Sequence, residues 1–167
     1  MLLDHVIPKP PSIRGYKLHR LVQGLTEGES SLFADMGDSI IVRTDKAITD
    51  KGIAPRAAVK GDIIGFELRA CVSKKIKGRH IYYPISDWRS RHAWLHKQGE
   101  RHGFEPLTIS CQADQAKVDN EKGRAFAVDQ TDFVGILRVT DSSHFENAVA
   151  NGVGSTAKAF GFGMLIV

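Results

Sequence analysis

The stretch that most constrains this chain is residues 152–163, which hold four glycines and one lysine and run into the apolar residues 164–167. Glycine permits positive φ angles and lets another backbone approach closely. Successive amides in such a loop can face one anion, and a lysine adds a positive charge beside them. We therefore expect either an anion-binding loop or a helix C-cap followed by a tight turn.

The residues around this loop differ from two common phosphate-binding motifs. The Gly-Lys-Ser/Thr ending of a Walker loop is missing, and the apolar residues that follow predict a strand where Walker and Rossmann loops lead into a helix. A helix is expected before the loop, because Ser143 to Glu146 form a capping box and Phe145 and Val149 an apolar face. The chain is thus predicted to close with a helix, a glycine-rich loop and a strand.

The composition is that of an ordinary globular protein, with 42% hydrophobic and 25% charged residues among 167. This length suffices for one sizeable domain or two small domains packed together. No apolar run approaches the roughly 20 residues of a membrane span, and Asp4, His5 and Pro8 interrupt the N-terminus, so no signal peptide is expected. Cys71 and Cys111 stand far apart, which argues against a disulfide framework or a zinc site and suits a reducing cytoplasm.

Positive charge is concentrated in one segment of a chain whose net charge is only +4. Between residues 69 and 101 the net charge is +7, so the rest of the chain carries −3. The nine basic residues of this segment are Arg69, Lys74, Lys75, Lys77, Arg79, Arg89, Arg91, Lys97 and Arg101. Such a concentration is typical of a polyanion-binding surface. The alternative is a basic face that is simply solvated.

The first half of the chain predicts the order strand, helix, strand, strand, short helix, strand. The helix begins near Tyr16, and Leu18, Leu21, Val22 and Leu25 form its apolar face. At about 100° per residue, Tyr16 and His19 fall together on a different face. Strands are expected at residues 2–7, 31–35, 39–43 and 63–70, with a short helix after Pro55. This order is that of a ferredoxin-like half.

The second half repeats the order. A basic loop is expected at residues 74–79 and a helix from Asp87, with Trp88 and Trp94 in the core. Strands are predicted at residues 106–111, 125–128 and 133–139, with a polar loop at 119–124 and the closing helix and strand at the end. We therefore predict an α+β fold of two ferredoxin-like halves, at residues 1–70 and 71–167. They should pack tightly, because no low-complexity linker separates them.

At Tyr16-Lys17-Leu18-His19 the sequence resembles the CasE-type endoribonucleases of the RAMP superfamily, which process CRISPR precursor RNA. In that family a Tyr-x-Leu-His stands on the first helix, after an apolar strand. Five further pieces resemble the family in its order: Leu32-Phe33 followed by acid, Phe66-Glu67-Leu68-Arg69-Ala70, Arg91-His92-Ala93-Trp94-Leu95, Phe133-Val134-Gly135-Ile136-Leu137 and the glycine-rich loop Gly152 to Gly163.

The resemblance implies a tandem ferredoxin-like fold and cleavage of a repeat stem-loop without metal or other cofactor. In that chemistry the ribose 2′-OH attacks the adjacent phosphate, leaving a 2′,3′-cyclic phosphate and a 5′-OH, and the enzyme stays bound to the product. By analogy His19 is the principal catalyst, since a histidine can gain or lose a proton near neutral pH. Tyr16, one helical turn earlier, can reach the same phosphate. Whether His19 acts as acid or base stays open.

The resemblance also indicates which residues contact RNA. Some relatives place a lysine shortly after the histidine, where this chain has Gly24 and Leu25, so Lys17, Arg20 or Lys158 is expected to supply the positive charge. The chain is shorter than is usual for the family, and the second helix of its first half is reduced. The predicted RNA-binding residues are Lys17, Arg20, Lys74, Lys75, Lys77, Arg79, Arg91, Lys122, Arg124, Gly154, Ser155 and Lys158.

The expected partners are a CRISPR repeat RNA stem-loop and other subunits of a CRISPR surveillance complex, with no membrane. The alternative hypothesis is a non-catalytic RNA-binding RAMP subunit on the same fold. A third hypothesis is a ferredoxin-like metal or metabolite binder, because His92 and His96 have metal-ligand spacing. Ala93 stands where His-Glu-x-x-His has its glutamate, so no metal site is predicted.

Overall fold

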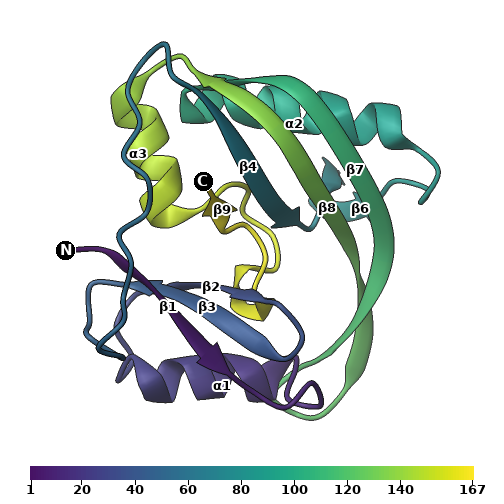
Figure 1. Cartoon of the computed structure of the whole chain (residues 1–167). Coiled ribbons are helices and arrows are strands. Elements are labelled where there is room, and N and C mark those ends of the chain that lie inside the picture. The colour runs from purple at the N-terminus through teal and green to yellow at the C-terminus, as the bar shows by residue number, and fades with distance from the viewer.

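The computed structural model describes residues 1–167 and contains two main antiparallel sheets (Figure 1). The first sheet has the strand order β1-β3-β2, with β1 at Leu3–Pro8, β2 at Leu32–Asp35 and β3 at Ser39–Thr44. The helix α1 (Tyr16–Leu25) covers one face of this sheet. Its apolar positions at helical spacing form a small core with the strands, made of Leu18, Val22, Phe33, Ile40 and Val42.

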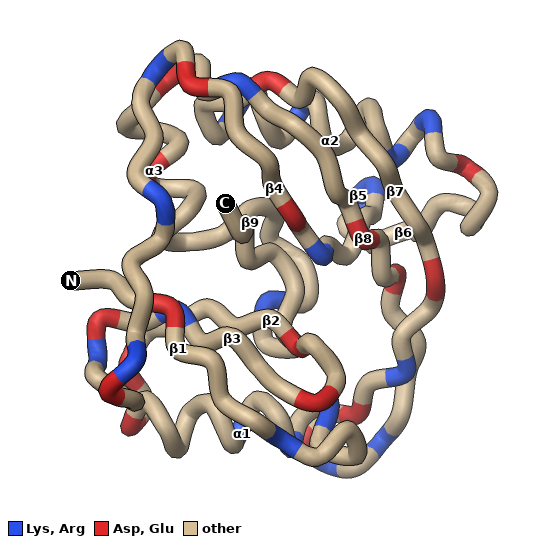
Figure 2. The backbone as a smooth tube through the Cα atoms, viewed as in Figure 1, with Lys and Arg blue, Asp and Glu red and all other residues tan.

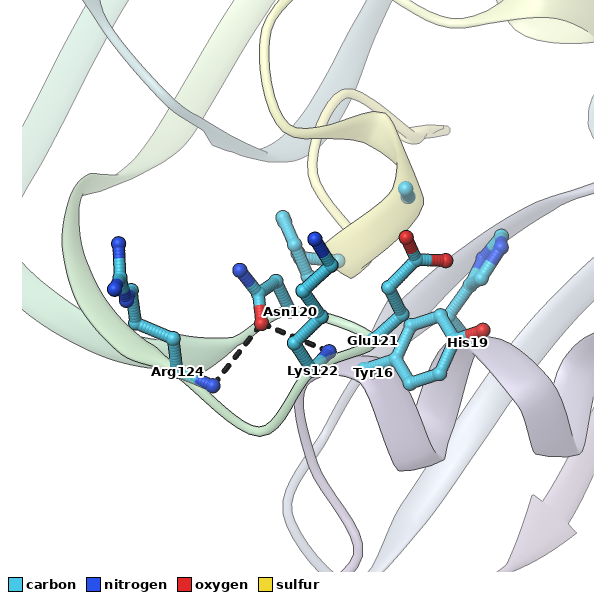
Figure 3. Close-up of a pocket in the computed structure, with 8 residues that line it drawn as sticks. Tyr16, His19, Asn120, Glu121, Lys122 and Arg124 are labelled. Carbon is cyan, nitrogen blue, oxygen red and sulfur yellow. Dashed lines mark hydrogen bonds between the residues drawn. The ribbon is translucent and has the colours of Figure 1, made fainter.

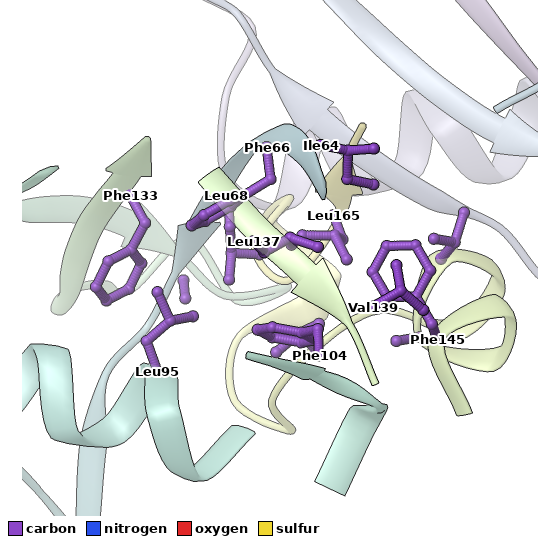
Figure 4. Close-up of a cluster of buried hydrophobic side chains, with 14 of the residues drawn as sticks. Ile64, Phe66, Leu68, Leu95, Phe104, Phe133, Leu137, Val139, Phe145 and Leu165 are labelled. Carbon is purple, nitrogen blue, oxygen red and sulfur yellow. The ribbon is translucent and has the colours of Figure 1, made fainter. Parts of the chain in front are cut away.

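The second sheet has the order β7-β8-β4-β9. Its strands are β4 at Ile63–Ala70, β7 at Phe104–Asp119, β8 at Ala125–Val139 and β9 at Leu165–Ile166. Residues of β4 alternate between the core and solvent, as period-2 strand geometry requires. The helices α2 (Trp88–His102) and α3 (Ser142–Asn151) pack on one face, where Leu95 and Phe145 join a core of 15 buried residues (Figure 4).

The strand β4 belongs to the second sheet, although the sequence placed it at the end of the first half. It pairs along its length with β8, and Leu68 pairs with Leu165 of β9. The elements β4, α2, β7, β8, α3 and β9 therefore follow the full order of a ferredoxin-like unit. The tandem ferredoxin-like fold is confirmed, with a shortened first half of one helix and three strands. The domain boundary at residue 70 stays a prediction.

Residues 45–62 connect β3 to β4 without a helix, so the short helix predicted after Pro55 is wrong. Between Pro55 and β4, only Ala58 packs against the large core. A helix here would have no apolar face to bury, and helices in proteins depend on such packing. The second helix of the first half, which the sequence predicted to be reduced, is therefore absent from residues 45–62.

Two hairpins lie where the sequence predicted a basic loop, at residues 74–79, and three separate strands, at residues 106–111, 125–128 and 133–139. The basic residues 74–79 form part of a hairpin of β5 (Ser73–Ile76) and β6 (Arg79–Tyr82), which turns at Lys77 and Gly78 with positive φ angles. The strands β7 and β8 form one long hairpin, paired from Phe104 and Val139 to Asp119 and Ala125. The outer part of this hairpin extends beyond β4, curves away from the rest of the second sheet and brings its tip beside α1 (Figure 1).

A buried arginine of the first half contacts the second half. Arg43 of β3 is 1% exposed and donates from Nε and Nη2 to the Asp4 carboxylate, at 2.7 Å each. Its Nη1 donates to the carbonyls of Val149 in α3 and Leu165 in β9, at 2.8 Å each. All three guanidinium nitrogens therefore have partners, and two of these partners belong to the second half.

The two tryptophans have different environments. Trp94 is half-buried and stacks on Phe133 with ring centroids 6.0 Å apart, so it packs against the core as predicted. Trp88 is 52% exposed at the first position of α2, where Arg89 lies over its ring, so its predicted place in the core is wrong. No helix of the protein has the length and apolar character needed to cross a membrane.

Candidate active site

Tyr16 and His19 lie side by side on α1. Their ring centroids are 6.1 Å apart, and both side chains are half-buried. The buried Leu18 and Val22 fix the other face of the helix against the first sheet. The structure therefore brings Tyr16 and His19 together on the face that helical spacing predicts.

A cavity of about 700 Å³ opens over these two side chains (Figure 3). Three segments that lie far apart in the sequence form it: α1, the loop at residues 120–124 between β7 and β8, and the short 3-10 helix η1 (Lys158–Phe160). Its lining residues are Tyr16, His19, Asn120, Glu121, Lys122, Arg124, Ala159 and Phe160. The cavity thus brings a histidine, a side chain able to transfer a proton, together with two cations from the other half of the chain.

The loop at residues 120–124 is held by one asparagine. The side-chain oxygen of Asn120 accepts the backbone N–H groups of Lys122 and Arg124, both at 3.0 Å (Figure 3). Gly123 completes the turn with a φ of +73°. This side-chain turn fixes the backbone from which both exposed cations project, so their charges stay near the cavity. Figure 2 shows blue segments at this hairpin tip, beside the start of α1.

His19 also lines a second cavity of about 1080 Å³, which contains Lys158. The Lys158 amine donates to the Asn151 carbonyl at 2.8 Å, and its burial lowers the pKa of the amine from its ordinary value. Lys17 and Arg20 are exposed and line neither cavity of His19. Of the three cations expected to supply positive charge, Lys158 is therefore the one that shares a cavity with His19.

The glycine-rich loop has a conformation that its glycines make possible. Gly161 has a φ of +87°, and a Cβ there would lie 2.9 Å from the Phe33 ring. The backbone N–H groups of residues 154–157 donate to no group of the protein, whereas those of Phe160, Gly161 and Gly163 have backbone acceptors. The loop therefore packs closely at its end and leaves its first amides free for another acceptor.

Residues 154–156 of the loop line a third cavity of about 870 Å³, which lies between them, α2 and the β5–β6 hairpin. Lys74, Lys75, Lys97 and Arg101 line it together with Gly154, Ser155 and Thr156. His102 lines the same cavity, and burial, followed by the charges of Lys158, Arg101 and His144, lowers the pKa of its imidazole. The loop thus runs from this basic cavity to the two cavities of His19.

Residues 14–167 match the family described as CRISPR associated protein. The chain belongs to this CRISPR-associated family. Its fold matches Cse3 of Thermus thermophilus, bound to an RNA representing a pre-cleavage complex, with a TM-score of 0.78 and 20% identity over 98% of this chain and 96% of that one. It also matches Cas6e of Escherichia coli K-12, with a TM-score of 0.76 and 20% identity over 99% and 97% of the two chains.

A chain of a CRISPR RNA-guided surveillance complex has a TM-score of 0.72 and 19% identity, over 96% of this chain and 95% of its own length. No curated protein matches the chain. At these identities the solved structures establish a shared fold. The family resemblance first indicated by Tyr16 and His19 is thus confirmed.

One predicted RNA contact of this CRISPR-associated protein is wrong. Arg91 is fully buried, and its Nη2 donates to Asp129 at 2.6 Å. Its Nε donates to the Thr131 hydroxyl, and its Nη1 to the carbonyls of Pro84 and Asp87. The guanidinium therefore joins α2 to β8 and presents no charge to a ligand. A buried acid on another strand gives no local signal in the sequence, so Arg91 could not be separated from the exposed cations around it.

Several residues that line these cavities are not among the predicted site residues. Asn120, Glu121 and Phe160 line the cavity over His19, and Lys97 and Arg101 line the basic cavity. Lys77 and Arg79 lie at the exposed turn of the β5–β6 hairpin, outside the lining of that cavity. No group of three or more His, Cys, Asp or Glu side chains is arranged to hold a metal ion.

Proposed function

We propose that this protein is an endoribonuclease that cleaves CRISPR precursor RNA within its repeat stem-loop and stays bound to the product. The observation that carries the proposal is the single cavity that Tyr16 and His19 line together with Lys122 and Arg124 (Figure 3). It offers proton transfer and positive charge at one place, which is what cleavage of RNA by its own 2′-OH requires. The Cse3 structure described as a CRISPR endoribonuclease bound to a 19-nucleotide RNA supports this assignment.

The reaction needs little more than these side chains. The 2′-oxygen attacks the adjacent phosphorus and loses its proton, while the 5′-oxygen leaves and gains one. His19 transfers a proton in this exchange, and Tyr16 contacts the same phosphate from one helical turn away. Lys158, Lys122 and Arg124 stabilise the additional negative charge of the phosphorane. The products are a 2′,3′-cyclic phosphate and a 5′-OH.

The basic cavity supplies the binding surface for the stem-loop in this proposal. Lys74, Lys75, Lys97 and Arg101 can neutralise phosphates, and the amides of residues 154–157 can donate to phosphate or sugar oxygens. These contacts do not involve the bond that is cut, so cleavage leaves them in place and the product stays bound. The proposal includes binding to other subunits of a surveillance complex. It also places the protein in a reducing cytoplasm, where the thiols of Cys71 and Cys111 stay free.

The proposal is tested by incubating the protein with RNA from candidate repeats. We expect one cut in each repeat, undiminished by EDTA, with a 2′,3′-cyclic phosphate on the upstream product. A single 2′-deoxy nucleotide at the cut site should abolish cleavage without weakening binding, because it removes the nucleophile alone. Cleavage that requires a divalent metal, or that continues on the deoxy substrate, would exclude this mechanism. Binding without any cleavage would favour the non-catalytic subunit.

Neutralising the β5–β6 hairpin should flatten the salt dependence of RNA binding. The variant replaces Lys74, Lys75, Lys77 and Arg79 with alanine. Each lost phosphate contact should reduce the slope of log K against log salt by about 0.7 for single-stranded RNA and by more for duplex. The slope is measured by titrating labelled repeat RNA at several salt concentrations.

The matched control neutralises Lys51, Arg56 and Lys60, which are exposed in the connection between β3 and β4. These residues line none of the three cavities. Their removal lowers the net charge in a similar way but should leave the slope unchanged. Equal slopes for the hairpin variant and the wild type would show that the hairpin is only a solvated basic face.

A further inference from the structure

The helix α1 has no N-terminal cap of its own. The residue before it is Gly15, which has no side chain, and the first turn holds no acidic residue. The first amides of any helix lack partners within the helix, so a helix that must hold two side chains in place needs an acceptor from elsewhere. Here the chain supplies that acceptor from a distant element.

Asp119, the last residue of β7, caps the helix. Its Oδ1 accepts the backbone N–H of Tyr16 at 3.1 Å, across 103 positions of sequence. A carboxylate at this place also interacts favourably with the positive end of the helix dipole. The long β7–β8 hairpin therefore ends on the helix that carries Tyr16 and His19.

Gly15 and Asp119 fit one another. A Cβ at Gly15 would lie 1.9 Å from Asp119 Oδ1 and 3.1 Å from the Asp119 amide nitrogen. Gly15 also has a φ of +63°, which side-chain-bearing residues rarely adopt. The absence of a side chain at Gly15 is thus what lets the carboxylate reach the helix.

We propose that Asp119 is a positioning residue for RNA cleavage, which sets the place of Tyr16 and His19 by holding the first amide of α1. The held amide belongs to Tyr16 itself, and the His19 amide donates to the Gly15 carbonyl at 3.1 Å in the first turn. The same hairpin carries Lys122 and Arg124. One strand pair therefore links the helix of Tyr16 and His19 to the two cations. This inference rests on the proposed function.

Misplacement of a catalytic group by about 1 Å can reduce a rate about 100-fold. We therefore expect Asp119→Ala to reduce the single-turnover cleavage rate at saturating RNA by up to about 100-fold. The Kd for RNA should change little. Asp119→Asn keeps an acceptor oxygen and should recover most of the rate. The pH–rate profile should keep its shape, because Asp119 bonds to an amide and not to the His19 ring. Gly15→Ala should resemble Asp119→Ala.

Two matched controls separate this effect from general damage. Asp114→Ala removes an exposed carboxylate from the same strand, and Gly24→Ala adds a methyl group to open space on the same helix. Both should cleave like the wild type. Amide hydrogen exchange of residues 16–19, measured without RNA, reports the cap directly. Loss of a cap oxygen should accelerate exchange there by about 2- to 30-fold.

The outcomes are distinct. Wild-type cleavage and wild-type exchange in a folded Asp119→Ala variant would overturn the inference, as would an Asp119→Asn variant as slow as Asp119→Ala. If the wild type cleaves no repeat RNA, the proposed function fails, while the exchange of the Tyr16 amide still decides whether Asp119 holds the helix. A weakened Kd at an unchanged saturated rate would assign Asp119 to binding and overturn the positioning role.

Discussion

Replacing His19 with alanine is expected to reduce single-turnover cleavage of repeat RNA by about 10²–10⁴-fold, the usual contribution of a general acid or base. Binding should change little, because the cations proposed to bind phosphate, those of the basic cavity and Lys122 and Arg124, remain. The measurement is the cleavage rate at saturating protein, together with the Kd for an RNA that carries a 2′-deoxy nucleotide at the cut site.

His96→Ala is the matched control, because it removes an exposed histidine from α2 that lines none of the three cavities. It should cleave like the wild type. The cleavage rate of Tyr16→Phe should lie between those of His19→Ala and His96→Ala, since this variant keeps the ring beside His19 and loses only the hydroxyl. A His19→Ala protein that cuts at the wild-type rate would remove His19 from the mechanism and direct attention to Lys158 and Glu121.

Of all the proposed variants, Asp129→Ala should cause the largest loss in free energy of unfolding. Asp129 accepts from the buried Arg91 at 2.6 Å, from the Thr131 hydroxyl at 2.8 Å and from the Val72 amide at 3.0 Å. Its removal leaves a buried guanidinium without a counter-charge, which costs about 3–5 kcal/mol. For a chain of this size the melting temperature should fall by about 6–20 °C. Thermal and urea unfolding followed by circular dichroism measure the change.

Glu105→Ala provides the control, because it breaks the ion pair with Arg138 at the exposed surface of the same sheet. Exposed pairs contribute about 0–1 kcal/mol, so this variant should melt close to the wild type. Combining Asp129→Leu with Arg91→Met removes both buried charges and should recover part of the lost stability. Equal melting of the Asp129 and Glu105 variants would mean that the buried pair does not hold α2 against β8.

The elements that could be predicted are those whose residues alternate between core and solvent. The spacing of Leu18 and Val22 predicted α1, and the alternation from Ile64 to Leu68 predicted β4. The β7–β8 hairpin was broken into pieces because its unpredicted stretches, residues 112–119 and 129–132, hold Val118 as their only large apolar residue, so no apolar pattern marks them. The cap of α3 was misplaced by two residues, since Asp141 rather than Ser143 accepts the amide of the first turn.

The site was predictable where its members are neighbours in sequence. Tyr16 and His19 share one turn of α1, and Lys122 and Arg124 stand together in a polar loop. Asp119 could not be found as the cap of α1, because only the three-dimensional path of β7 brings it there. Sequence spacing predicts contacts within an element, while contacts between elements depend on strand pairing and curvature that no local pattern specifies.

The buried Arg43 has a consequence for how the two halves move. A hinge motion between them would pull its Nη1 away from the carbonyls of Val149 and Leu165 and leave buried N–H groups without acceptors, which is costly, while the pair with Asp4 stays within the first half. We therefore expect the angle between the halves to be the same with and without a bound ligand. If the proposed function holds, we expect the two halves to keep one orientation on binding, so that the conformational adjustment falls to the nucleotides of the RNA.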